Sequence, residues 1–210
     1  MNDKFYNLPK EKQQAIINAG YRIFSQNSYK KSPMQEIADA AGISKSLLFH
    51  YFHNKKELYM FLWDTCGKIS MSTMMDYGCY DRRDLFEMME RGLKAKIYIM
   101  KKYPFMGSFV IRAFYETDPS VRPEIEKSYA KLISMKAAPS WSNLETDQFI
   151  EGVKPERILR EMYLASEGYL WELQHKGYVN IEEDIEKIET DFKEMIAFWK
   201  KIYLKGGDKR

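Results

Sequence analysis

The sequence predicts an all-α fold with an N-terminal three-helix helix-turn-helix domain over residues 1–53 and a larger helical domain over residues 54–210, about nine helices in all. Three observations predict this fold. Apolar residues recur at helical spacing along nearly the whole chain, and strand-like alternation bounded by turn pairs is absent. A glycine separates two short amphipathic segments near the N-terminus, and the last segment carries a heptad-like apolar seam.

The composition is that of a globular protein with an uneven charge distribution. Of the 210 residues, 45% are hydrophobic and 15% aromatic, which is enough for a substantial core. The net charge is only +3, but residues 1–60 contain nine Lys or Arg against five Asp or Glu. The remaining residues carry 24 basic against 25 acidic side chains. A positive excess at the N-terminus is what a polyanion-binding domain requires.

The first helix is expected to run from Pro9 to about Gln26 and to end at Asn27-Ser28-Tyr29. Its apolar side chains form a stripe against which the next two helices can pack. The stripe consists of Ala15, Ile16, Ala19, Ile23 and Phe24.

The stretch from Ser32 to Leu58 is predicted to form two short helices around a tight turn, followed at once by a third helix. Ser32 can cap the first of them, with Pro33 at the first helical position. Gly42 supplies the positive φ that ends this helix, and Ser44 caps the next.

The second short helix of this stretch is expected to point Leu48 and Phe52 inward. The side chains left on its outer face are Lys45, Ser46, Leu47, Phe49, His50 and Tyr51. A helix, a glycine turn and a capped short helix form a helix-turn-helix pattern, in which the second helix lies in a DNA major groove.

A family resemblance rests on four runs within this region. They are Ile37-Ala38, Ala41-Gly42-Ile43-Ser44-Lys45, Leu48-Phe49-His50-Tyr51-Phe52 and Asn54-Lys55-Lys56-Glu57-Leu58. Together they closely resemble the DNA-binding domain of TetR-type transcriptional regulators, over roughly residues 8 to 63. A bare helix-turn-helix pattern gives many false matches, but the added F-x-N-K-x-x-L segment makes this match specific.

The resemblance implies a set of DNA-contacting side chains. The set is Ser32, Ser44, Lys45, Ser46, Leu47, Phe49, His50, Tyr51 and Lys55. Lys45 can donate to guanine O6 or N7, and Leu47 can contact a thymine methyl group. His50 and Lys55 match positions that contact phosphate, whereas Phe49 lacks the hydroxyl of the Tyr that is usual there.

Six further helices are expected after the turn at His53-Asn54. They run from Asn54 to about Tyr77, from after Asp81 to about Tyr103, from Pro104 to about Thr117, from the Pro119–Pro123 break to about Ala138, from Pro155 to about Lys176, and from about Glu182 to Leu204. The segment from Pro139 to Lys154 is expected to be a loop. The helix that begins at Asn54 would connect the DNA-binding domain with the rest of the chain.

The two closing helices are expected to form a four-helix interface in a homodimer. In the last helix, apolar residues follow one another at alternating steps of four and three, which is a coiled-coil-like seam. The preceding helix is apolar on two sides, so it is either buried on both or meets another chain. The expected interface consists of Leu159, Tyr163, Leu170, Ile188, Phe192, Met195 and Trp199.

The middle of the chain is rich in aromatic residues and methionine, which at helical spacing are core residues more often than pocket linings. TetR-type regulators usually have a cavity for a small molecule in the C-terminal domain. Aromatic and methionine walls suit a lipophilic or aromatic effector, cations included. The residues expected to bind it are Tyr98, Phe105, Phe109, Phe114, Met135, Trp141, Tyr163 and Trp171.

No catalytic or metal site and no cofactor are predicted. His50, His53 and Glu57 are spaced like ligands on one helix face, but the break at His53-Asn54 separates them. Neither a G-x-S-x-G elbow nor a P-loop occurs. Cys66 and Cys79 lack CxxC spacing, and no signal peptide or membrane-length apolar run is found, so a cytoplasmic protein without membrane contact is expected.

These observations lead to one hypothesis with two alternatives. The hypothesis is a homodimeric transcriptional regulator, most simply a repressor, that leaves a near-palindromic DNA operator when a small effector binds. One alternative is a regulator of the same fold without an effector. The other is a helical protein-interaction module with no DNA function.

Overall fold

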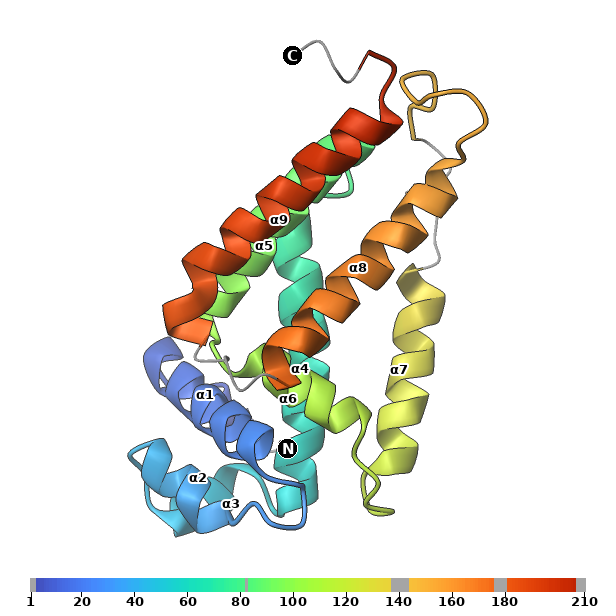
Figure 1. Cartoon of the computed structure of the whole chain (residues 1–210). Helices are drawn as coiled ribbons and strands as arrows, with labels where there is room; N and C mark the ends of the chain where they lie inside the picture. Colours follow the sequence, from blue (N-terminus) through green and yellow to red (C-terminus); the bar gives the residue numbers. More distant parts are fainter. Residues whose placement is uncertain (1–2, 82, 137–143, 176–180, 207–210) are drawn as a thin grey trace. The chain divides into compact units, whose positions relative to one another are not determined.

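The computed structural model describes residues 3–81, 83–136, 144–175 and 181–206, and over these ranges the fold is all-α (Figure 1). The elements are η1 (Asp3–Phe5), α1 (Lys10–Gln26), α2 (Met34–Ala40), α3 (Lys45–Tyr51), α4 (Lys55–Asp76), α5 (Leu85–Lys102), α6 (Met106–Phe114), α7 (Arg122–Lys136), α8 (Pro155–His175) and α9 (Ile181–Tyr203). The only β-type pairing in the described residues is an isolated bridge between Phe149 and Leu204. The predicted fold class is confirmed, and each predicted helix is present.

The chain forms two compact units. The first comprises Met1–Ile69 and Lys102–Lys136, and the second comprises Ser70–Lys101 and Ala137–Arg210. Helices α6 and α7 therefore belong to the same unit as the helix-turn-helix, and α4 runs from one unit into the other. The functional division at residues 53 and 54 is a different kind of boundary and stays a prediction.

The core of the first unit is a cluster of aromatic rings from α1, α4 and α6. The ring centroids of Phe24 and Tyr59 are 4.8 Å apart, and those of Tyr59 and Phe109 are 5.2 Å apart. The ring centroids of Tyr21 and Phe109 are also 5.2 Å apart. Such large buried rings supply much of the apolar burial of a small unit. They fix α6 against α1, which packs on α2, and α2 in turn packs on α3.

Local capping explains where the short helices begin. Gly42 has a φ of +67° in the turn before α3, and Ser44 Oγ accepts a hydrogen bond from the Leu47 N–H (3.2 Å). Asn54 Oδ1 accepts from the Glu57 N–H (2.8 Å) at the start of α4. The expected cap at Ser32 is wrong, because its buried hydroxyl donates to the Ser28 carbonyl (2.9 Å) and so points back toward the preceding turn.

The core of the second unit consists of apolar side chains from α5, α8 and α9 together with Phe149, and α9 lies alongside α5 (Figure 1). The α9 seam faces this core, since Ile188, Phe192 and Trp199 are buried within the chain. Their expected place in a dimer interface stays a prediction, and the structure gives them packing partners within the same chain. Leu159 and Met195 are partly buried against the same core, and the side chain of Leu170 lies outside the described residues. Heptad spacing predicts a buried face but does not say which helix covers it.

Candidate nucleic-acid interface

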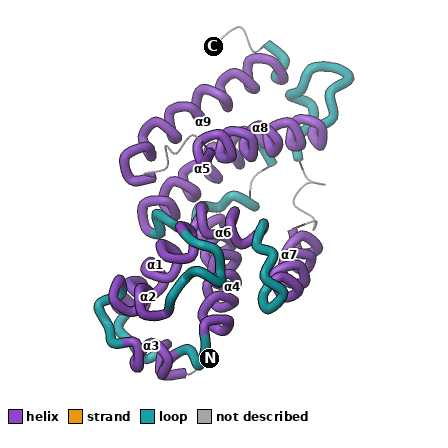
Figure 2. Tube along the Cα trace, turned by 60° about the horizontal axis from the view of Figure 1, so that its bottom comes forward, coloured by secondary structure: helices purple, strands orange, loops and turns teal. Residues whose placement is uncertain are grey.

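Helix α3 is anchored to the first unit by its inward side chains. Leu48 and Phe52 are fully buried, in the positions that the helical period predicts. The opposite face is solvent-exposed and carries Lys45, Ser46, Leu47, Phe49 and His50. Leu47 and Phe49 are each 37% exposed, so this face of α3 presents two large apolar side chains to solvent. Figure 2 shows α3 at the edge of this unit, beside α2.

Tyr51 does not lie on this exposed face, and the expectation that it does is wrong. Its side chain is only 6% exposed, and its ring centroid lies 6.2 Å from that of Phe5. The physical reason is that η1 packs against the C-terminal end of α3. Spacing within α3 could not predict this contact, because Phe5 is distant in sequence.

Lys55 is engaged with the turn between α1 and α2. Its ammonium group donates to the Lys30 carbonyl (3.1 Å) and lies 4.7 Å from the centroid of the Tyr29 ring. Burial lowers the pKa of the Lys55 ammonium. Lys30 and Lys31 in the same turn are exposed. The expected phosphate contact of Lys55 stays a prediction, and it would have to be made from this tethered position.

Sequence reasoning missed a second tether of the α1–α2 turn. Arg112 Nε of α6 donates to the Ser25 carbonyl (2.8 Å). Glu116, which follows α6 and is 9% exposed, accepts the Tyr29 N–H on Oε2 (2.7 Å). Its Oε1 accepts the N–H groups of Thr117 (2.9 Å) and Asp118 (3.1 Å). Both long-range bonds join positions 87 apart in sequence, so no local pattern predicts them.

The residues expected to bind an effector are divided between the two compact units. Phe109 is fully buried in the aromatic core of the first unit, and its assignment to a ligand site stays a prediction. Phe105 and Phe114 belong to that unit as well, and the Phe114 ring packs on Tyr129 at 5.0 Å. The members in the second unit, all exposed, are Tyr98, Tyr163 and Trp171. Trp141 and the side chain of Met135 lie outside the described residues.

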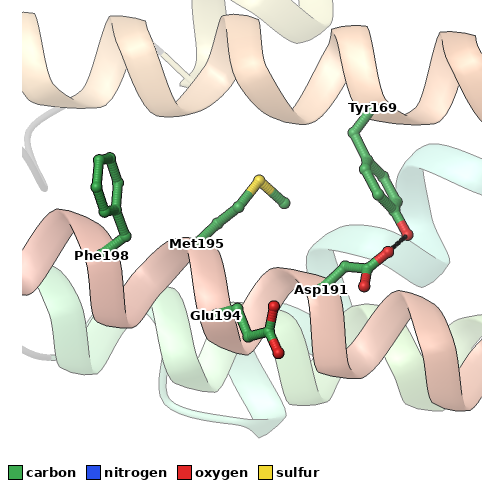
Figure 3. A pocket seen from close by; sticks show the side chains of 5 residues that line it. All are labelled: Tyr169, Asp191, Glu194, Met195 and Phe198. Atoms are coloured by element: carbon green, nitrogen blue, oxygen red, sulfur yellow. Dashed lines mark hydrogen bonds between the residues drawn. The ribbon is translucent and has the colours of Figure 1, made fainter.

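The second unit has a shallow hollow of about 360 Å³ between α8 and α9 (Figure 3). It is lined by Tyr169, Asp191, Glu194, Met195 and Phe198. The Tyr169 hydroxyl donates to Asp191 Oδ2 (2.6 Å). Burial is the main cause that raises the pKa of Tyr169, and the bond to Asp191 is the second. Hydrogen bonds from Lys187 and Tyr169 lower the pKa of Asp191. The hollow thus combines apolar walls with a carboxylate rim.

The described residues contain no group of three or more His, Cys, Asp or Glu side chains that could hold a metal ion. His53 Nδ1 and Glu57 Oε2 are 2.8 Å apart. Cys66 and Cys79 are buried free thiols, and burial raises the pKa of Cys66 to about 12. Over the part of the chain that the structure describes, no helix has the length and apolar character to span a membrane.

Comparisons with known proteins point to the same segment. The family model described as "Bacterial regulatory proteins, tetR family" matches residues 16–60. The chain is 24% identical over 160 residues to the HTH-type transcriptional regulator RutR of Escherichia coli O157:H7, which covers 75% of this chain and 73% of RutR. It is 37% identical over 54 residues to the transcriptional activator FasR of Mycolicibacterium smegmatis, a quarter of each chain.

A solved structure is similar over nearly the whole length. The TetR family transcriptional regulator from Chloroflexus aurantiacus J-10-FL has a TM-score of 0.57 to this chain, with 16% identity, and the match covers 97% of this chain and 98% of that one. At this identity the likeness shows the fold. RutR and FasR are both regulators of transcription.

Proposed function

The chain belongs to the TetR family of bacterial transcriptional regulators, and from this premise we propose that it is a homodimeric repressor released from its operator by a small lipophilic or aromatic effector. The observation that carries the DNA-binding part is the face of α3. Two fully buried anchors, Leu48 and Phe52, hold this short helix with its opposite face exposed. Lys45 and Leu47 on that face have the chemistry to read guanine and thymine in a major groove.

Dimerisation is supported by apolar side chains on α8 and α9 that the chain leaves exposed. They are Tyr163, Leu164, Trp171, Phe198 and Ile202, and Phe198 is 60% exposed. Large apolar side chains exposed on the surface are typical of protein interfaces where they gather. We propose that a second copy of the chain covers these exposed residues, and that they form the dimer interface instead of the buried α9 seam. A two-fold dimer would then present two α3 helices to half-sites ~34–36 Å apart, on a near-palindromic operator.

Effector binding is supported more weakly, by the hollow between α8 and α9. Tyr169, Met195 and Phe198 offer it apolar walls, and Glu194 offers negative charge for a cationic group. We propose that α4, which is continuous from one compact unit into the other, transmits the effect to the DNA-binding face. A coupling free energy of ~1–3 kcal/mol is sufficient for such a switch. The alternative is a regulator of this fold that has no effector.

Selection from a library of random-sequence duplexes tests the DNA-binding proposal. Wild-type protein should enrich a near-palindromic sequence, and Lys45→Ala should bind that sequence more weakly by about 1–3 kcal/mol. Lys94→Ala is the matched control, since Lys94 is an exposed lysine on α5 of the second unit. Failure of the wild type to enrich any sequence would contradict DNA binding and favour the interaction-module alternative.

A thermal-shift screen with lipophilic and cationic compounds tests the effector. Compounds that stabilise the protein should also release the selected duplex in fluorescence anisotropy. Transcription in vitro from a promoter that contains the selected sequence then tests the sign of regulation. Stabilising compounds that leave DNA binding unchanged would favour the effector-independent alternative.

A further inference from the structure

The segment that precedes α1 is built into the DNA-binding unit. Phe5, at the end of η1, is only 1% exposed. Its ring centroid lies 5.1 Å from that of Phe52, 5.1 Å from that of Phe61, and 6.2 Å from that of Tyr51. Tyr51 and Phe52 form the C-terminal end of α3 and its cap. Phe5 therefore fills the space behind the end of the helix that carries the exposed face.

A buried side-chain amide holds the same segment from the other side. Gln13 of α1 is 7% exposed, and its Nε2 donates both to the Tyr6 carbonyl (3.1 Å) and to the Leu8 carbonyl (2.8 Å). A primary amide has two N–H donors, and here each has an acceptor in the segment. The Leu8 N–H donates to the Phe5 carbonyl (3.2 Å). This bond forms a turn between Phe5 and Leu8. Residues 4–8 thus have a fixed path.

This path leaves the neighbours of Phe5 facing solvent. Lys4 is exposed, and Tyr6 is 48% exposed, with its ring 6.5 Å from that of Phe61. In Figure 2 the described beginning of the chain lies beside α3. DNA phosphates border the groove into which a recognition helix inserts, and contacts to them fix the register of a protein on the duplex. A lysine held beside the end of α3 is suited to such a contact.

We propose that residues 4–8 form a second DNA-binding element, in which Phe5 positions the C-terminal end of α3 and Lys4 contacts the DNA backbone beside the groove. This inference rests on the proposed DNA binding. Phe5 is a positioning residue, because it acts through Tyr51 and Phe52. Lys4 supplies electrostatic affinity that does not depend on base sequence.

The test uses the full-length protein and the duplex that the wild type enriches, with an unselected random-sequence duplex for comparison. Lys4→Gln should lower the slope of log affinity against log salt by about one unit on both duplexes. Lys94→Gln, at the exposed lysine of α5, should leave that slope unchanged. A thermal unfolding scan of Lys4→Gln is the control for a change in stability, and Gln keeps a polar side chain at this exposed position. A wild-type salt slope in Lys4→Gln would overturn the backbone contact.

The role of Phe5 is tested by the selectivity of binding between the two duplexes, which a loss of stability alone would not change. Phe5→Ala should weaken binding to the selected duplex by about tenfold, the scale of one lost base-pair contact, and change binding to the unselected duplex little. Phe5→Leu keeps an apolar side chain under Phe52, so it should fold and recover most of the selectivity. Equal loss on both duplexes, or wild-type selectivity in both variants, would overturn the positioning role.

Failure of the inference and failure of the proposed function are distinguishable. If the wild type enriches a sequence but these variants bind like the wild type, only the role of residues 4–8 is wrong. If the wild type enriches nothing, DNA binding itself is wrong and the inference is overturned with it.

Discussion

Replacement of Glu116 by Gln tests the tether between the end of α6 and the α1–α2 turn. The carboxylate of Glu116 accepts three backbone N–H groups, those of Tyr29, Thr117 and Asp118, at 2.7–3.1 Å. A glutamine has one acceptor oxygen, so its NH₂ group must face at least one of these donors. Water cannot easily reach the unpaired backbone N–H or the new NH₂ group, because Glu116 is only 9% exposed.

The magnitude follows from the number of bonds that are lost. A hydrogen bond to a charged group contributes about 1.5–3 kcal/mol, and an unsatisfied buried donor costs a similar amount. We expect Glu116→Gln to lower the free energy of unfolding by about 2 kcal/mol, if one donor is left without an acceptor. The loss should be local to the first unit, since all three donors belong to it.

Two measurements check this expectation. Urea denaturation followed by circular dichroism gives the free energy of unfolding, and hydrogen exchange gives the protection of the Tyr29 amide, which should fall. Glu124→Gln is the control, because Glu124 is half-exposed and paired with Lys56 at 2.5 Å on the surface. Such a surface pair contributes at most about 1 kcal/mol. Unchanged Tyr29 protection, or a loss in Glu116→Gln no larger than in the control, would refute the reasoning.

Three further predictions concern the interface, the salt dependence and the pH dependence. Phe198→Glu should give folded monomers in sedimentation, because it places a charge on the proposed dimer surface, whereas Trp199→Glu should unfold the second unit, because Trp199 is buried in its core. Lys55→Ala should lower the salt slope of DNA binding by about one unit if its ammonium reaches phosphate. Asp191→Asn should slightly destabilise the second unit above the ordinary pKa of aspartate. Because Lys187 and Tyr169 lower the pKa of Asp191 in the folded state, this difference should disappear as the pH falls through that lowered value, in unfolding measured across a pH series.

Each of these predictions has an outcome that contradicts it. Persistent dimers of Phe198→Glu would remove the exposed α9 face from the interface. An unchanged salt slope in Lys55→Ala would exclude a phosphate contact and leave only the contacts of this lysine with the Lys30 carbonyl and the Tyr29 ring. A stability difference for Asp191→Asn that persists in acid would show that its cause is packing and not the charge of the carboxylate.

The sequence by itself determined the features that depend on neighbouring residues. The α3 start at Ser44, the turn at Gly42 and the α4 start at Asn54 agree with prediction, because caps and glycine turns are made by side chains within a few positions. The inward direction of Leu48 and Phe52 also follows from the helical period alone. These features were sufficient to predict the helix-turn-helix and the all-α class.

Only the tertiary structure decided which surfaces those helices cover. The α9 seam is buried against α5 and α8 of the same chain, so Phe192 and Trp199 are core residues, although their spacing is equally that of an interface. Tyr51 is covered by Phe5, and Tyr29 is tethered by Glu116. The physical reason is common to all of them: periodicity defines which face of a helix is apolar, but the partner of that face is fixed by contacts between residues far apart in the chain.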